Sequence, residues 1–372
     1  MATPLEVLYT SPQAVKRWSK ALMVATMQKT QYGKFSSSDG DKPFQILTDL
    51  TKGAGDQIKF DLLSQMANTY FGINGNTAMI NAVAGSSTNE QNLVFYQETV
   101  EIEQKRMAHS WYRMNQQRSL HDFMKAAMRN LSDQWAQTID RWAAVHLVGL
   151  SVLNAADTAG TACVADIAAH QATAGGGTAI EAHDPGHIMA GSSGVSFDPF
   201  LHLSAARWKA ESLTTPSPLA RINVDGHETF VMFIRPEQAA SLTANSDWIA
   251  AQQGAGVRGM DNPIFSGALG TWGGIVVHVW HYLPYGSGAS ALQRYAVLCG
   301  KQALAVAFGN ALDVIDQEKY GKDFVFAFVP RDQSDYGNIK GVSAGAIFGM
   351  RRTMFASATY GCLRVDSTDP NV

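Results

Sequence analysis

The sequence predicts a mixed α and β protein of class α+β, built around one long helix. Apolar side chains recur every three or four positions from residue 118 to residue 150, which is helical spacing. Around residues 58–62 and 100–103, apolar and charged residues alternate, as they do in half-buried strands. From residue 200 onward, helical and strand patterns follow one another. A chain of 372 residues can bury a large core, and we expect two lobes.

The charge of the chain is nearly balanced, with 29 Lys and Arg residues against 32 Asp and Glu residues and a formal net charge of -3. No basic excess therefore indicates nucleic-acid binding as the main task. Cys163, Cys299 and Cys362 lack the paired spacing of a zinc site or a redox dithiol, which predicts free thiols in a reducing compartment. The chain shows neither a secretion signal nor an apolar stretch as long as a membrane span, so we expect a soluble protein kept in the cytoplasm.

The first two strands are preceded by a region that mixes a helical pattern with a polar segment. Residues 1–50 combine a short helical pattern with the polar segment GKFSSSDGDK, and we interpret them as an arm without a core of its own. The strands around residues 58–62 and 100–103 are expected to pair antiparallel. The segment that joins them is too long for a tight turn, and long for any structureless loop in a compact domain. We therefore expect it to project from the body.

The projecting segment carries apolar side chains that water would disfavour, namely Tyr70, Phe71, Met79 and Phe95. We expect these residues to meet another surface, on a neighbouring copy of the chain. They are equally compatible with a segment that folds back on its own chain.

The long helix of residues 118–150 is one-sided, with an apolar stripe and a charged remainder. Ser119 and Asp122 have the spacing of a capping box, and Gly149 stands where a left-handed stop is expected. A helix of this length would run roughly 45 Å, longer than an ordinary compact domain is wide, so we expect it to act as a beam. Asp133 and Asp140 are interpreted as solvated residues of the charged face. The stripe comprises Leu120, Phe123, Met124, Ala127, Met128, Leu131, Trp135, Ile139, Trp142 and Leu147.

The remainder of the chain predicts an insertion followed by helices and strands. Residues 154–196, rich in Ala, Gly, Ser and Thr, are interpreted as an insertion with loop character. Because Phe324, Phe326 and Phe328 occupy one face of a strand pattern and small apolar groups the other, we place that strand at the centre of a sheet. The expected elements are helices at 201–211 and 236–242 and strands at 229–234, 274–280, 294–300, 323–330 and 346–355.

One short pattern indicates catalysis. GVSAG, residues 341–345, satisfies the glycine, any, serine, any, glycine pattern of a nucleophile elbow with Ser343 as the nucleophile. An elbow needs a helix after the serine and a histidine later in the chain, whereas a strand pattern follows and the last histidine is His281. The competing interpretation is a glycine-rich turn between strands. A serine hydrolase is therefore kept only as an alternative.

Other patterns for ligands are weak. His183 and His187 have a spacing that a metal could use, with Asp184 nearby, but Pro185 and Gly186 break the helix that would align them, which favours a surface loop. No phosphate-binding glycine loop and no dinucleotide fingerprint occurs in the sequence. We therefore assign no catalytic, cofactor-binding or metal-binding residue and expect no cofactor.

Six segments, spread in order over most of the chain, resemble the major capsid proteins of tailed phages, and more specifically those of schitovirus-type (N-four-like) podoviruses. No single segment is a catalytic signature, so the specificity comes from their order and number. The segments are GDQIKFDLL at 55–63, EQKRMAHSWYRMNQQRSLHDFMKAAMRNLSDQWAQTIDRWAAVHLVG at 103–149, RPEQAASLTANSDWIAAQ at 235–252, NPIFSGALGTWGGIVVH at 262–278, LCGKQALAVAFG at 298–309 and DYGNIKGVSAGAIFGMRRTMF at 335–355.

The resemblance implies the tailed-phage major capsid fold, also called the Hong Kong ninety-seven-type fold, with a long spine helix. NTYFGINGNTAMIN and the insertion around 160–196 do not match the family, so the lateral contacts do not follow from it. The implied regions are an N-terminal arm at 1–50, an extended loop with flanking strands at 51–108, a peripheral domain with the spine helix and the insertion at 109–199, an axial domain at 200–320, and returning peripheral-domain strands with a tail at 321–372.

The function that follows is that of a structural protein, not an enzyme, which self-assembles into the icosahedral head enclosing the double-stranded DNA of a bacteriophage. The implied partners are many copies of itself in hexamers and pentamers, together with scaffold, portal and decoration proteins, and no membrane. Near-neutral charge suits a wall that contacts DNA only weakly and without sequence specificity. The implied location is the virion capsid, assembled in the cytoplasm of a bacterial host. Besides the Ser343 hydrolase, an encapsulin-like cellular shell holding a cargo enzyme remains an alternative.

Overall fold

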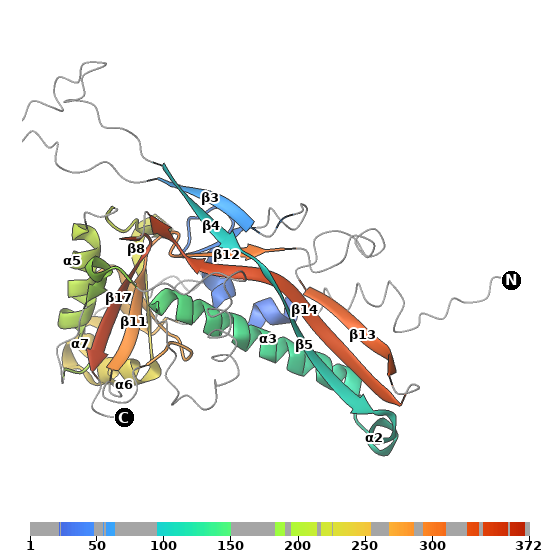
Figure 1. Cartoon of the computed structure of the whole chain (residues 1–372). Helices are drawn as coiled ribbons and strands as arrows, with labels where there is room; N and C mark the ends of the chain where they lie inside the picture. The colour runs from blue at the N-terminus through green and yellow to red at the C-terminus, as the bar shows by residue number, and fades with distance from the viewer. Residues whose placement is uncertain are drawn as a thin grey trace, which may run out of the picture.

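The computed structural model shows an elongated molecule in which two sheets are joined by one long helix (Figure 1). Within the described residues, no helix combines the length and the apolar character needed to span a bilayer. The structure describes residues 22, 24–47, 55, 57–63, 95–149, 183–189, 195–213, 217–224, 226–253, 268–285, 293–309, 326–334, 338–355 and 358–368.

A seven-stranded sheet forms one half of the body and has a core on each face. Along β8, Phe230, Met232 and Ile234 belong to one core and Val231 and Phe233 to the other, as the period of two in a strand requires. The strand order is β6 (Ile188–Met189), β17 (Cys362–Thr368), β11 (Gln293–Cys299), β8 (His227–Ile234), β10 (Ile275–Val279) and β9 (Gly270–Trp272), with β7 (Ile222–Val224) paired to β8.

Three helices and one π-helical turn cover the face of the sheet that carries Phe230, Met232 and Ile234. The sequence prediction of a helix at 201–211 is confirmed, although its first turn is π-helical. The strand predictions at 229–234, 274–280 and 294–300 are confirmed by β8, β10 and β11. The covering elements are the π-helical turn Pro199–Ser204, α5 (Ala205–Ser212), α6 (Pro236–Ala244) and α7 (Ser246–Gln253).

A six-stranded sheet forms the other half of the body, and β14 is its longest strand. β14 forms antiparallel ladders with three strands, β12, β13 and β5. The prediction that residues 323–330 form a central strand was wrong, because among the described strands β13 pairs with β14 only. The strand order is β1 (Ser36–Ser37), β2 (Phe44–Leu47), β12 (Leu304–Phe308), β14 (Ile339–Arg352) and β13 (Phe326–Ser334), with β5 (Glu103–Tyr112) also paired to β14.

The long helix α3 (Phe123–Val148) runs beneath β14 and β5 and reaches the seven-stranded sheet (Figure 1). Its 26 residues span about 39 Å. Trp135 and Trp142 pack on Phe348 of β14, with ring centroids 6.0 and 5.3 Å apart. Gly149 ends the helix with a φ of 66°, as predicted.

The start of α3 differs from the sequence prediction. Asp122 is the N-cap, and its side chain accepts hydrogen bonds from the backbone N–H groups of Met124 and Lys125. Ser119 instead ends a separate short helix, α2 (Arg113–Arg118), and Leu120 is fully exposed between the two helices. The apolar stripe therefore begins at Phe123 and does not include Leu120. The reason is that α2 ends at Ser119 and α3 begins after Asp122, and side chains of these two types bind nearby backbone groups at helix ends.

Asp140 was expected on the solvated face, and this prediction was wrong. Its side chain is only 4% exposed and accepts a hydrogen bond from the backbone N–H of Gln31 at 3.0 Å. The described part of residues 1–50 covers this side of α3, and Phe35 and Phe44 lie in the main core against Phe233. Residues 22–47 thus have no core of their own but complete the core of the body.

Candidate assembly surfaces

The hairpin expected from the sequence is present and projects from the body (Figure 1). β3 (Gln57–Leu63) pairs antiparallel with β4 (Phe95–Glu101), in a register that places Ile58 opposite Val100. Both of these side chains are buried in a small core shared with β2 and β12. This contact confirms the predicted antiparallel pair and fixes the base of the hairpin to the six-stranded sheet.

An ion pair reinforces the base of the hairpin. Arg351 of β14 lies 2.7 Å from the carboxylate of Glu98, which is only 3% exposed. The same guanidinium donates a hydrogen bond to the backbone oxygen of Thr99 at 3.0 Å. A buried carboxylate needs such a partner because its desolvation is costly. The pair therefore holds β4 at one position on β14.

β4 can lie so close to β14 because position 349 is a glycine. A Cβ atom on Gly349 would come within 1.7 Å of the carbonyl oxygen of Glu101. No side chain can occupy that space without moving the backbone. This glycine thus determines where the chain turns from β4 into β5.

The outer part of the hairpin exposes apolar side chains, which we call the hairpin surface: Leu63, Phe95 and Tyr96. Phe95 is 62% exposed, so of the four residues singled out from the sequence this one stands on the surface. Tyr70, Phe71 and Met79 lie outside the described residues. The ring of Tyr96 packs on Phe355 at 5.4 Å, which keeps the exposed edge attached to the body.

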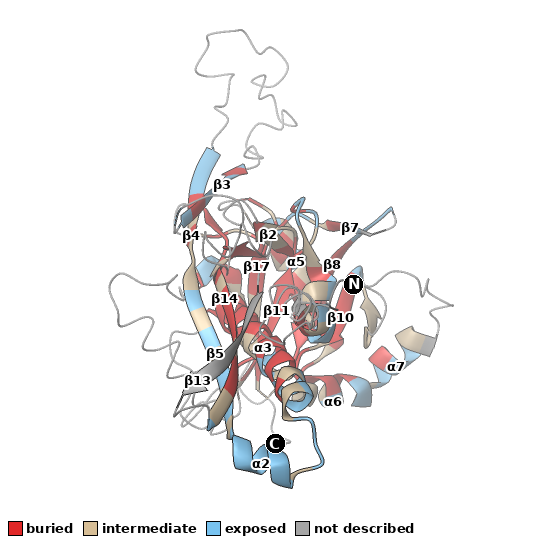
Figure 2. Cartoon of the chain, turned by 90° about the vertical axis from the view of Figure 1, so that its right-hand side faces the viewer, coloured by how far each residue is buried: buried red, intermediate tan, exposed pale blue. Residues whose placement is uncertain are grey.

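A second exposed apolar group, the α2 surface, lies at the far end of the body and comprises Tyr112, Met114 and Leu120. None of the six residues of α2, all of which are described, is buried. Figure 2 shows this exposure as the pale blue colour of α2. A helix this short is marginal in water without packing, and none of its own side chains is buried against the body.

A third group, the α5 surface, comprises Phe200, Leu201 and Trp208. Trp208 is 68% exposed, which is unusual for so large an apolar side chain. The opposite side of the same helical segment buries Leu203, Ala206 and Ala210. The sequence analysis did not identify this surface. A signal for this surface was present in the sequence, because large apolar residues occur on both sides of the helix at 201–211. Burial of one side of a helix does not explain the apolar residues on the other side.

The geometry at Ser343 does not form a nucleophile elbow. Ser343 lies inside β14, opposite Ala108 of β5 on one side and Val329 of β13 on the other. A strand continues on both sides of it, whereas an elbow turns sharply into a helix. The competing prediction of a glycine-rich turn was also wrong. The predicted strand at 346–355 is present but begins earlier, at Ile339.

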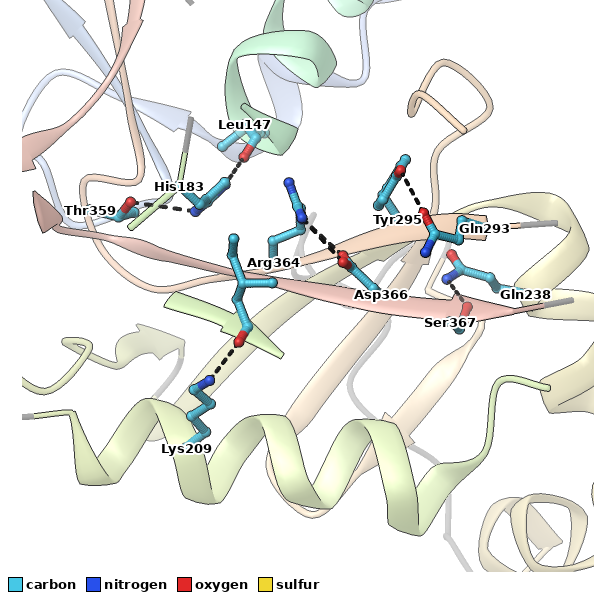
Figure 3. A network of polar contacts seen from close by, with 11 residues as sticks. Leu147, His183, Lys209, Gln238, Gln293, Tyr295, Thr359, Arg364, Asp366 and Ser367 are labelled. Carbon is cyan, nitrogen blue, oxygen red and sulfur yellow. Dashed lines mark hydrogen bonds and ion pairs between the residues drawn. The ribbon is translucent and has the colours of Figure 1, made fainter. Parts of the chain in front are cut away.

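His183 and His187 were expected in a surface loop, and this prediction was wrong because both side chains are buried. Among the described residues, no group of three His, Cys, Asp or Glu side chains could hold a metal ion. His183 lies between the end of α3 and Thr359 of β16 (Ala358–Thr359), as Figure 3 shows. These histidines therefore connect elements of the body.

Hydrogen bonds define the protonation state of His183. The carbonyl oxygen of Leu147 can only accept, so Nε2 of His183 carries the hydrogen and donates it at 2.7 Å. Nδ1 is left to accept from the hydroxyl of Thr359 at 3.4 Å. Burial lowers the pKa of His183 well below its usual value, and the positive charge of Arg352 adds to this effect. The ring is thus held neutral.

Other polar contacts near β17 tie the same region together (Figure 3). Lys209 of α5 donates to the backbone oxygen of Ile188 at 2.6 Å, and Arg364 pairs with Asp366 at 2.8 Å. Burial raises the pKa of Asp366, although the adjacent Arg364 guanidinium opposes this. Burial also lowers the pKa of His187, against the effect of its bond with Asp184. These groups attach residues 183–189 and α5 to β17.

The arrangement of the spine helix, the long strands and the projecting hairpin is similar to that of solved phage capsid structures. The Capsid of Ralstonia phage GP4 superimposes with a TM-score of 0.70 at 24% identity, covering 91% of each chain. The Cyanophage Pam1 capsid superimposes with a TM-score of 0.64 at 18% identity, covering 93% of this chain and 94% of that one. The predicted Hong Kong ninety-seven-type α+β fold is thereby confirmed.

The chain belongs to the phage capsid protein family, whose model matches residues 6–370. A relative with a known role is the major capsid protein of Pseudomonas phage KPP25, which is 27% identical over 142 residues. That match spans 36% of this chain and 34% of the relative, or about a third of the length of each.

Proposed function

We propose that this chain is the major capsid protein of a tailed phage, which assembles in many copies into the icosahedral head around double-stranded DNA. The observation that carries this proposal is the presence of three apolar surfaces on one family member: the hairpin, α2 and α5 surfaces. They lie on different elements and differ in composition, so none is a copy of another. Heterologous contacts of this kind build closed rings and shells, whereas a twofold dimer needs only one self-complementary surface.

In this proposal, each region expected from the sequence has a role in assembly. The hairpin and its tip at 51–108 would overlap a neighbouring copy, and Tyr70, Phe71, Met79 and Phe95 would contribute to that contact. The axial domain at 200–320 would meet its copies at the centre of hexamers and pentamers. The remaining regions are the arm at 1–50, the peripheral domain at 109–199 and its returning strands at 321–372.

The finer assignment is a head of the schitovirus-type (N-four-like) podoviruses, assembled in the host cytoplasm with scaffold, portal and decoration proteins. The net charge of -3 supports only weak contact with the enclosed DNA. Portal and terminase genes beside the coding gene would support this assignment. A cargo peroxidase or ferritin-like gene in their place would support an encapsulin-like shell.

We also propose that the chain works without catalysis. Support comes from the placement of Ser343 in the middle of a strand, which leaves the one nucleophile suggested by the sequence without an elbow. A fluorophosphonate probe should leave the native protein unlabelled. Labelling at Ser343 would contradict this part of the proposal.

The direct test is the state of the purified full-length chain. We expect sedimentation and negative-stain electron microscopy to find large closed particles, formed by the chain alone or with a scaffold protein supplied in the same cell. A chain that remains monomeric at high concentration with and without the scaffold would overturn the proposal. Filled and empty particles can then be separated by density to check for DNA.

A further inference from the structure

Two cysteines face each other across two neighbouring strands. Cys299 is the last residue of β11 and Cys362 the first residue of β17, and the antiparallel register places them directly opposite each other. Both are free thiols and fully buried. Both belong to the core that contains α3, so their side chains project from the same face of the sheet. The linear sequence separates them widely, and only the strand pairing brings them together.

The hydrogen bonds around the pair identify its geometry. The backbone N–H of Gly300 donates to the carbonyl oxygen of Gly361 at 2.9 Å. This bond flanks Cys299 and Cys362, which makes them a non-hydrogen-bonded pair of the ladder, the type in which Cα atoms approach to about 4.5 Å. Disulfides form between cysteines whose Cα atoms are about 4.4–6.8 Å apart. A pair of this type therefore has a Cα separation that a disulfide allows, at the short end of the range.

Two glycines, Gly300 and Gly361, flank the cysteines at positions where there is no room for a side chain. A Cβ atom on Gly300 would lie 2.4 Å from the carbonyl oxygen of Ala220, and one on Gly361 would lie 2.6 Å from that of Lys301. Both positions are therefore closely enclosed by backbone.

We propose that Cys299 and Cys362 are an intramolecular disulfide site, which stays reduced where thiols are maintained and closes when a small disulfide is the oxidant. The thiolate of one cysteine attacks the small disulfide and releases one small thiolate, which takes up a proton. The second cysteine then attacks the resulting mixed disulfide and releases the other small thiol. Two cysteine thiols and one small disulfide thus become one protein disulfide and two small thiols.

The burial of the pair determines how the exchange proceeds. Burial raises the pKa of Cys362 to about 12, although the nearby positive charge of Arg352 opposes the shift. Burial also raises the pKa of Cys299 well above its usual value, with an added effect from Cys362. Because both thiols are fully buried, the small disulfide reaches either of them only through a local opening of the strand pair. The exchange should be slow at neutral pH and faster as the thiolate fraction rises.

The bond would link two neighbouring strands of the seven-stranded sheet and close a loop that contains strands of the other sheet. The chain between Cys299 and Cys362 includes β12, β13 and β14, which belong to the six-stranded sheet, while both cysteines belong to the seven-stranded sheet. Closing this loop restricts the unfolded chain and resists the detachment of β17. The site lies inside one chain, so it does not depend on the proposed assembly.

The experiment uses the full-length reduced protein, incubated with oxidised glutathione in the folded state. Remaining thiols are alkylated, the protein is digested without reductant, and linked peptides are identified by mass spectrometry. We expect one intrachain link between Cys299 and Cys362, formed about tenfold faster for each unit of pH below the thiol pKa. Low concentrations of urea that open β17 should accelerate it.

Matched variants separate this site from the third cysteine. Cys362→Ala should abolish the link, whereas Cys163→Ala should leave its yield and rate unchanged. The oxidised protein should resist unfolding at a higher urea concentration than the reduced protein. Links from Cys163 to either cysteine, links between chains only, or two thiols that stay reduced in urea would each overturn the proposal. Identification of the linked peptides in the unaltered chain tests the proposal even if a variant fails to fold.

Discussion

His183 shows how a single buried side chain connects distant parts of the subunit. Its neutral ring bonds the last turn of α3 through Leu147 and the short strand β16 through Thr359. Protonation would place a hydrogen on Nδ1, toward a hydroxyl that now donates to it, and a positive charge near Arg352. The folded state therefore disfavours the charged ring.

This environment predicts that acid weakens the subunit through His183. Because its folded pKa lies below the ordinary value of about 6.5, the folded state binds fewer protons than the unfolded state. The contribution of His183 to the free energy of unfolding should be complete above about pH 6.5. It should decrease as the pH falls from there toward the folded pKa. Urea midpoints between about pH 7.5 and about pH 5 measure the slope.

The variant His183→Gln should be less stable at neutral pH but should lose less stability between the two pH values. His121→Gln is the matched control, because the side chain of His121 is exposed. An unchanged slope in His183→Gln would show that the acid sensitivity arises elsewhere, for example at His187, whose pKa burial also lowers.

The ion pair of Glu98 and Arg351 gives a second prediction at the residue scale. Glu98→Gln removes the negative charge from a nearly buried position and leaves the guanidinium without its carboxylate. We expect a loss of stability on the order of 2 kcal/mol, less than for a fully buried pair because Arg351 is partly exposed. Hydrogen exchange should accelerate in β3 and β4 first. Asp61→Asn, an exposed change on the same hairpin, should leave exchange as it was.

At the scale of elements, the glycine of β14 at position 349 determines the crossing of two strands. The methyl group of Gly349→Ala would clash with the carbonyl oxygen of Glu101, so β4 or β14 must move. We expect a loss of about 3 kcal/mol or more, as overpacking and backbone shifts produce. Thermal unfolding of the purified variant measures it. Ser343→Ala in the same strand serves as the control, and equal stability of both variants would refute the role of Gly349.

The cap of α3 also belongs to this scale. Asp122→Ala removes the acceptor for the N–H groups of Met124 and Lys125 and should cost about 1 kcal/mol. Ser119→Ala lies outside α3 and should cost less. Urea unfolding of the two variants compares the caps directly. A larger effect at Ser119 would mean that the helix begins earlier than Asp122.

The whole molecule presents three separated apolar surfaces, and the α5 surface offers a direct test of their common role. Trp208→Ser should leave the fold intact, because the side chain is mostly exposed, and should reduce assembly strongly. Circular dichroism measures the fold and sedimentation the particle size. Val24→Ser replaces another exposed apolar residue outside the three surfaces and should assemble normally. Normal particles from Trp208→Ser would exclude the α5 surface from the contacts.

The sequence by itself determined the elements whose signals are local. Helical spacing and Gly149 identified α3 and its end, and alternating residues identified the hairpin strands. Each of these signals depends on side chains within one or two turns or a few strand positions of one another. The order of such segments also carried the resemblance to capsid proteins.

Only the tertiary structure decided which polar residues are buried and which distant positions meet. Asp140 has the spacing of an exposed residue, but residues near Gln31 cover it, and Ser343 fits an elbow pattern although β14 continues through it. Cys299 and Cys362 show no pairing until β11 and β17 lie side by side. Burial and register depend on contacts between segments far apart in the chain, which local spacing does not contain.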